Sequence, residues 1–167
     1  MLKLFFISLI NLILFQSLFA QNSFVENCPG IWKGTMYIYN SGSVKDSIDV
    51  KLTVAKTAIT GEWKWKTEYL SDKLPIVKDY VLRLKDKEKN IYVIDEGDSV
   101  ELYNYLFGNK LYCVFETEGI MLTSIYELKG EELVFEVTSG KKLPAINESV
   151  SNFSVNNLQR VVFRKIE

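Results

Sequence analysis

The sequence predicts an all-β protein, an antiparallel up-and-down meander of about eight to ten strands that closes into a barrel. Apolar and polar residues alternate with a period of two through most of the chain after residue 30, which is typical of strands with one buried face. Short turn sequences separate the alternating segments. A sheet of about ten strands tends to curl and close, because closure removes its exposed edges. A two-sheet β-sandwich is the alternative that these observations leave open.

The first three strands are expected at Trp32 to Tyr39, Ser47 to Val54 and Ile59 to Tyr69. The third gives the clearest alternation. One of its faces carries Ile59, Gly61, Trp63, Trp65, Thr67 and Tyr69, and the other carries Glu62, Lys64, Lys66 and Glu68. A helix would spread these charges around its circumference, so their complete sorting indicates a strand.

The later strands follow at short spacing. They are expected at Lys78 to Leu84, Ile91 to Asp95, Ser99 to Phe107, Lys110 to Thr117, Met121 to Leu128, Glu132 to Thr138 and Gln159 to Ile166. Gly108-Asn109 and Lys129-Gly130 separate neighbouring strands closely enough for tight hairpins. Two longer connections, Leu70 to Val77 and Ser139 to Leu158, interrupt this rhythm. Residues 21–167 have the length of one domain, and they are expected to form a single β-barrel domain.

Residues 1–20 have the parts of a cleavable signal peptide. Lys3 is basic, Leu4 to Phe15 is largely apolar, and the small residue Ala20 precedes Gln21. Cleavage near Ala20 is therefore expected, with a secreted or periplasmic product that has no membrane span. The alternative is a retained membrane anchor. It is disfavoured because crossing a bilayer takes about 20 apolar residues, and this run is shorter.

The composition limits the partners and the chemistry. The chain has 20 basic and 21 acidic residues and no histidine. No basic patch stands out, which argues against nucleic acid as a partner. The lack of histidine removes Ser-His-Asp and Cys-His catalysis and histidine-ligated metals. We therefore expect no metal, no cofactor and no enzyme, although carboxylate chemistry of the kind used by glycosidases stays open.

The two cysteines, Cys28 and Cys113, both lie after the signal segment. An even number of cysteines in an exported chain favours a disulfide between them. Two buried free thiols are the alternative, because Cys113 lies within an apolar strand pattern.

The motif Gly30-Ile31-Trp32 opens the first strand. Gly-x-Trp at this place in a secreted meander resembles the calycin superfamily, which contains the lipocalins and the avidins. The resemblance implies that Trp32 closes one end of the barrel. It also implies that an arginine of the last strand packs across the indole, a part that Arg160 or Arg164 could take.

The avidin branch implies a bridge between Cys28 and Cys113, because avidins have a cysteine shortly before Gly-x-Trp that is bridged to one in the later half. Two features depart from these families. No tryptophan follows Trp65, whereas avidins place several on later strands. The lipocalin Thr-Asp-Tyr signature is matched only by Lys78-Asp79-Tyr80, which comes early.

Three functions follow from this reading. The first is binding of a small apolar or amphipathic molecule inside the barrel, with the loops Asn40 to Asp46 and Leu70 to Val77 beside the mouth. The aromatic candidates for the cavity wall are Trp32, Trp63, Trp65, Tyr69 and Phe115, for which plain core packing is the alternative. The second function is a solid-barrel interaction module that binds a protein or a glycan through its loops. The third is a carboxylate-dependent enzyme.

Overall fold

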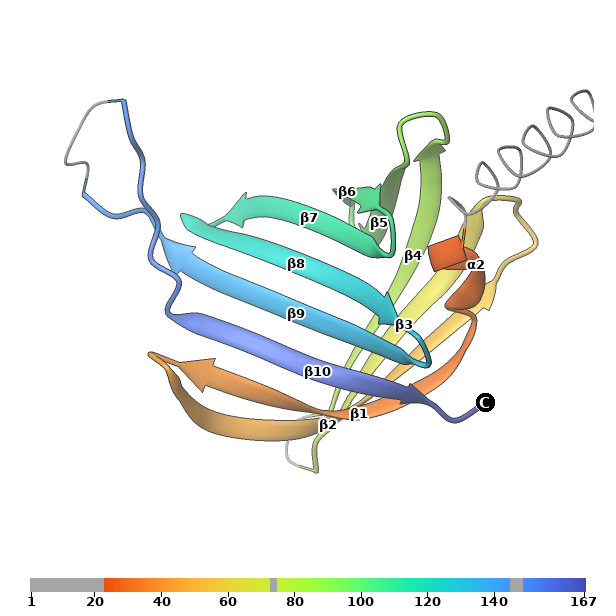
Figure 1. Cartoon of the computed structure of the whole chain (residues 1–167), viewed down its shortest axis with the longest axis horizontal. Coiled ribbons are helices and arrows are strands. Elements are labelled where there is room, and N and C mark those ends of the chain that lie inside the picture. The colour runs from red at the N-terminus through yellow and green to blue at the C-terminus, as the bar shows by residue number, and fades with distance from the viewer. Residues whose placement is uncertain (1–22, 73–74, 145–148) are drawn as a thin grey trace, which may run out of the picture.

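The computed structural model describes residues 23–72, 75–144 and 149–167. The expected signal segment and its cleavage point lie outside these residues. A short helix precedes the strands of the described chain (Figure 1). The elements are α2(Ser23–Asn27), β1(Gly30–Asn40), β2(Ser43–Lys56), β3(Glu62–Leu70), β4(Ile76–Asp86), β5(Ile91–Gly97), β6(Val100–Phe107), β7(Lys110–Thr117), β8(Ile120–Lys129), β9(Glu132–Lys141) and β10(Asn157–Lys165). No helix among the described residues is long and apolar enough to cross a bilayer.

The strands form one closed barrel in the order β1-β10-β9-β8-β7-β6-β5-β4-β3-β2. Each strand pairs antiparallel with its neighbours in sequence, and β1 also pairs with β10. This confirms the predicted all-β meander and its closure into a barrel, and the two-sheet sandwich is wrong. An expected strand underlies every strand of the barrel.

The main differences from the expected boundaries lie at β2 and β3. Pairing between β1 and β2 continues to Asn40↔Ser43, so the expected loop from Asn40 to Asp46 is only the turn Ser41-Gly42, with φ values of 49° and 79°. Positive φ at both central residues gives a turn whose twist matches the strands, which lets the hairpin extend beyond the core. At β3, Ile59 lies in the preceding turn and is exposed, and not on the inner face as expected.

The two ends of the barrel differ. Because successive connections of a meander alternate between ends, the β1–β2, β3–β4, β5–β6 and β7–β8 turns and the β9–β10 connection share one end, here called the open end. The other end, called the closed end, carries α2 and the C-terminal residues (Figure 1). Phe24 and Val25 of α2 are almost fully buried and belong to the same apolar cluster as Trp32. The helix therefore plugs the closed end with side chains.

The barrel closes through a tight approach of β1 and β10. A Cβ atom on Gly34 would lie 2.4 Å from the backbone oxygen of Val162 and 2.8 Å from Cγ2 of Val161. Real Cβ atoms do not come so close to backbone, so this position needs glycine. The same strands stay in register from Trp32↔Lys165 to Asn40↔Asn157.

Candidate functional site

A cavity of about 180 Å³ lies in the half of the barrel toward the open end. Its apolar wall comes from Ile94, Leu102, Phe115, Leu122, Phe135 and Val137. Its polar lining comes from Thr67, Tyr69, Lys78, Tyr80, Glu96, Asn104, Cys113, Ser124, Tyr126 and Gln159. These positions are every second residue of each strand from β3 to β10, so the period-two pattern itself directs them inward. The cavity is amphipathic, with apolar side chains beside neutral hydrogen-bonding groups and with Lys78 and Glu96 as its charged residues.

Three aromatic rings build one side of this cavity. The rings of Tyr126 and Phe135 stack, with centroids 4.2 Å apart and planes at 21°. Trp65 meets Tyr126 edge to face, with centroids 5.1 Å apart. Trp65 is fully buried and lies behind Tyr126 without lining the cavity. The wall is therefore two layers thick here, and contacts of this kind hold the inner ring in one orientation.

Two buried donors of the barrel lack an acceptor. The indole nitrogens of Trp63 and Trp65 have no hydrogen-bond partner in the described part of the protein. The Tyr126 hydroxyl interacts with Trp65 and Thr67, but it does not complete a hydrogen bond of standard geometry with the indole. Burial raises the pKa of Tyr126, so this hydroxyl keeps its proton at neutral pH. Buried unpaired donors are uncommon in proteins, and each raises the free energy of the folded state.

The mouth of the cavity brings a cation, a carboxylate and two phenols together. Lys78 Nζ lies 5.7 Å from the centroid of the Tyr80 ring. Burial raises the pKa of Tyr80, and the charge of the adjacent Glu96 raises it further. Burial and Glu96 raise the pKa of Tyr69 in the same way. Both phenols are therefore neutral hydrogen-bonding groups in the physiological range.

The expected disulfide is wrong, because Cys28 and Cys113 are both free and buried. Cys28 belongs to the closed end, where its carbonyl oxygen accepts a 2.8 Å hydrogen bond from Trp32 Nε1. Cys113 points inward from β7 and lines the cavity. Burial raises the pKa of Cys113 and raises that of Cys28 to about 12. Both are therefore thiols at neutral pH, and a thiol is a poor nucleophile.

The five aromatic candidates divide into two groups. Tyr69 and Phe115 line the cavity. Trp63 and Trp65 point inward but are core residues, and Trp32 belongs to the closed end. Sequence reasoning missed Tyr80, Tyr126, Phe135 and Asn104. The alternation along their strands would have placed them inside, but it could not show which inward residues leave a space between them.

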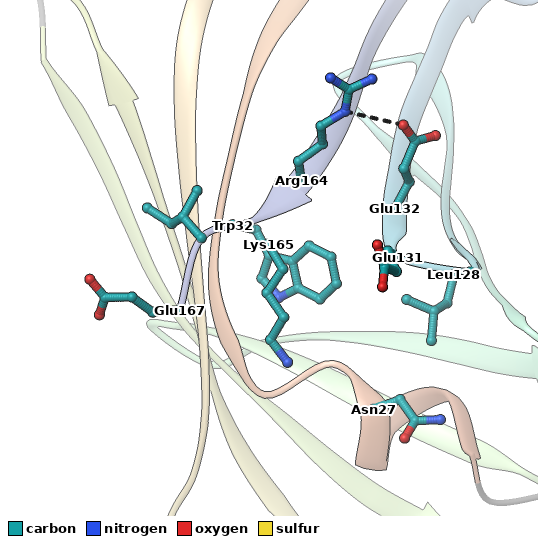
Figure 2. A pocket seen from close by; sticks show the side chains of 10 residues that line it. Asn27, Trp32, Leu128, Glu131, Glu132, Arg164, Lys165 and Glu167 are labelled. Carbon is teal, nitrogen blue, oxygen red and sulfur yellow. Dashed lines mark hydrogen bonds and ion pairs between the residues drawn. The ribbon is translucent and has the colours of Figure 1, made fainter.

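A cation does pack across Trp32, but it is not an arginine. Lys165 Nζ lies 5.4 Å from the centroid of the indole, and Figure 2 shows its side chain running beside the ring. Arg164 turns away toward Glu132, with Nε 3.3 Å from Oε1. Arg160 likewise pairs with Glu136 at 2.7 Å. The expected role of Arg160 or Arg164 is therefore corrected to Lys165.

Gly30 makes the packing of Lys165 possible. Its φ is 143°, and a Cβ atom there would lie 2.2 Å from Cε of Lys165 and 2.5 Å from the backbone oxygen of Glu167. The glycine of the Gly-x-Trp motif thus leaves room for the cation over the tryptophan. The surrounding surface hollow, of about 710 Å³, combines charged side chains such as Glu131 and Arg164 with the apolar groups of Trp32, Leu128 and Ile166, and Figure 2 shows most of these side chains.

The sequence matches no protein-family model and no curated protein. Solved structures do resemble the barrel. The S-type phycobiliprotein lyase CPES from Guillardia theta matches with a TM-score of 0.63 and 7% identity, over 87% of this chain and 92% of that chain. A DUF3598-family protein of unknown function from Nostoc punctiforme matches with a TM-score of 0.60 and 11% identity, over 85% of this chain and 49% of the other. This chain therefore spans about half of that protein.

A mutant of the fluorescent protein UnaG matches with a TM-score of 0.51 and 18% identity, over 86% of this chain and 99% of that chain. The fold is that of a calycin-like barrel. The resemblance inferred from Gly-x-Trp is confirmed at the level of the fold.

Among its described lining residues, the cavity near the open end lacks a pair of carboxylates. Glu96 is the one carboxylate that lines the cavity, whereas glycosidases use a pair. Glu127 of β8 forms ion pairs with Lys110 and Lys129 on the outer surface. No group of three or more cysteine and carboxylate side chains in the described chain is placed to hold a metal ion.

Proposed function

We propose that this calycin-like barrel binds one small amphipathic molecule in the cavity near its open end. The observation that carries the proposal is the lining itself. Apolar side chains such as Phe115 and Phe135 alternate there with neutral donors and acceptors such as Asn104, Ser124 and Tyr126. Binding sites for small molecules have this composition, with apolar walls for affinity and a few polar groups for orientation.

The size of the cavity limits the ligand. Its volume of about 180 Å³ is below the roughly 300–1,000 Å³ of pockets that enclose drug-sized molecules. The ligand is therefore either very small or has only its apolar end inside.

A cavity-filling substitution tests this proposal. Val137→Trp adds an indole to the cavity wall, and Val44→Trp adds the same group to an exposed position of β2. Isothermal titration calorimetry with decanol should show one bound molecule in the unmodified protein and in the Val44→Trp variant, and none in Val137→Trp. Equal binding by both variants, or no binding of decanol, decylamine or decanoate by the unmodified protein, would contradict a ligand cavity.

The cellular location of the protein is a second part of the proposal. We infer from residues 1–20 that the barrel works outside the cytoplasm after removal of its signal. Expression of the full chain in a host with a secretion pathway, followed by sequencing of the N-terminus, tests this. A mature chain that begins near Gln21 and is recovered from the periplasm or the medium supports export, and a cytoplasmic chain that begins at Met1 contradicts it.

A second candidate function is favoured by the outer surface of β6 and β7. Tyr103, Tyr105, Phe107 and Val114 are exposed there, and Phe107 packs edge to face on Tyr112. Contiguous exposed apolar groups often mark contact surfaces for other proteins. Cross-linking of the unmodified protein and of the Tyr105→Lys variant in the native cell extract tests this function. A specific adduct that forms with the unmodified protein and not with the variant depends on this surface, and the same adducts with both proteins would contradict the function.

A further inference from the structure

The wall of the barrel is weakest between β6 and β7. These strands share three residue pairs, Tyr105↔Tyr112, Leu106↔Leu111 and Phe107↔Lys110, all next to the closed end. The other neighbouring strands share between five pairs, as in β4–β5, and eleven, as in β1–β2. Residues 100–104 of β6 and 113–117 of β7 therefore have no ladder partner across this boundary. We call this unpaired stretch the seam.

The seam borders the cavity directly. Leu102 and Asn104 line the cavity from β6, and Cys113 and Phe115 line it from β7. The wall at the seam thus consists of side chains and not of a hydrogen-bonded ladder. Separating β6 and β7 here breaks no pair of the register, whereas separating any other neighbours would break ladder hydrogen bonds.

The outer side of the seam is also apolar. Tyr103 is 46% exposed and Val114 is 63% exposed, and these residues would face each other if the register continued. An apolar chain that passes through the seam would therefore touch apolar groups on the inner and the outer surface. Because the cavity is too small for a drug-sized molecule, part of a longer ligand must extend out of the cavity through the mouth or through the wall.

The outer lip of the seam is acidic. Glu116 is exposed and makes no ion pair within the described chain, and Glu118 follows in the adjacent turn. Glu101 would face Glu116 if the register continued. Its Oε1 forms an ion pair with the Arg83 guanidinium at 2.8 Å. A cationic head group is favoured beside such carboxylates and an anionic one is disfavoured. At the mouth, by contrast, Lys78 accompanies Glu96.

We propose that the ligand is an elongated amphiphile that lies across the seam, with its apolar end in the cavity and a cationic head group outside, beside Glu116. This inference rests on the proposed function, because it assigns the shape and charge of the molecule that the cavity holds. It also assigns Glu116 as the residue that selects the charge of the head group.

Charge reversal at three exposed positions tests the route. The probes are decylamine, decanol and decanoate, which share a chain and differ in the charge of the head group. Glu116→Lys alters the lip of the seam, Lys78→Glu alters the mouth, and Glu131→Lys makes the same charge change in the β8–β9 turn at the closed end. Affinities are measured by calorimetry at low ionic strength, where surface charges are least screened.

The seam predicts a specific pattern. Glu116→Lys lowers the affinity for decylamine about two- to fivefold and raises that for decanoate by a similar factor, while decanol binds as before. Glu131→Lys changes none of the three. The effect of Glu116→Lys disappears at high salt, because the carboxylate is exposed.

Other outcomes overturn the proposal without touching the proposed function. If Lys78→Glu raises the affinity for decylamine while Glu116→Lys has no effect, the head group leaves through the mouth. If decanol binds and no substitution discriminates between the charged probes, the whole ligand lies inside. Failure of the proposed function has a different signature, because then Val137→Trp does not affect any bound probe or no probe binds at all.

Discussion

Lys165 lies over the indole of Trp32, with Nζ 5.4 Å from the ring centroid, and the two residues are partners in the register between β1 and β10. Val161 and Phe163 are buried on the inner face of β10. Since successive side chains of a strand alternate, Lys165 shares their face and Arg160 and Arg164 do not. The parity of the strand therefore decides which basic residue reaches Trp32.

Replacement of Lys165 by methionine should destabilise the barrel through loss of this cation–π contact. The expected decrease in the free energy of unfolding is about 0.5–1 kcal/mol, the range for exposed sites, and urea denaturation measures it. Arg164→Met is the matched control, because Arg164 pairs with Glu132 on the surface. A larger loss for Arg164→Met than for Lys165→Met would show that the contact with Trp32 contributes nothing.

Gly34→Ala should destabilise the closure of the barrel. The added methyl group meets the backbone oxygen of Val162 at 2.4 Å, so β1 and β10 must move apart. Overpacking of this kind costs about 1–3 kcal/mol, which lowers the urea midpoint. Lys33→Ala, at the adjacent exposed position, should leave the midpoint nearly unchanged, and equal midpoints for the two variants would contradict the close approach.

The thiols provide a test of the corrected disulfide. Because Cys28 and Cys113 are free and buried, iodoacetamide should modify neither in the folded protein and both after unfolding in urea without reductant. Mass spectrometry of the intact chain counts the added groups. A chain that takes up none in urea until a reductant is added would restore the bridge between them.

Stability should fall in alkali. Burial raises the pKa of Tyr69, Tyr80, Tyr92 and Tyr126 in the folded protein. A raised pKa means that the folded state holds the proton more tightly than the unfolded state. The stabilisation that comes from these protonated tyrosines is therefore complete at pH values below their pKa in the unfolded chain, about 10. It is lost as the pH rises from there through the pKa of the folded state.

Circular dichroism and tyrosinate absorbance, followed together through this alkaline range, measure the effect. The buried tyrosines should ionise only as the barrel unfolds. Between neutral and alkaline pH, the Tyr126→Phe variant should lose less of its free energy of unfolding than the unmodified protein does. Ionisation of all the tyrosines before any loss of the far-ultraviolet signal would contradict the assignment.

The fold could be predicted from the sequence because local pattern and global architecture agree. The alternation at β3 places Trp63, Trp65 and Thr67 inside, as expected from the charges between them. Helix α2 was missed. It has five residues, too few for a helical period to show, and what places it is the burial of Phe24 and Val25 against the closed end.

The site was less accessible to sequence reasoning. Tyr69 and Phe115 line the cavity as predicted, and they were chosen because they are aromatic residues of strands. The same rule proposed Trp65, which Tyr126 covers. Alternation shows that a side chain points into the barrel, but it does not show whether that side chain reaches the cavity surface. The pairing of β6 with β7 runs only from Phe107↔Lys110 to Tyr105↔Tyr112, although both strands continue. No residue pattern along β6 or β7 predicts this end of the pairing.

The pairing of β1 with β10 joins parts of the chain that are made at different times. Asn40 Nδ2 donates to Asn157 Oδ1 at 2.7 Å across 117 residues of sequence. A ribosome releases β1 long before it releases β10, so one edge of β1 waits without a partner while the hairpins between them form. Such an edge can recruit another chain, and contacts this distant in sequence form slowly. We therefore expect the pairing of β10 with β1 to be the last step of folding, the step that closes the sheet into a barrel.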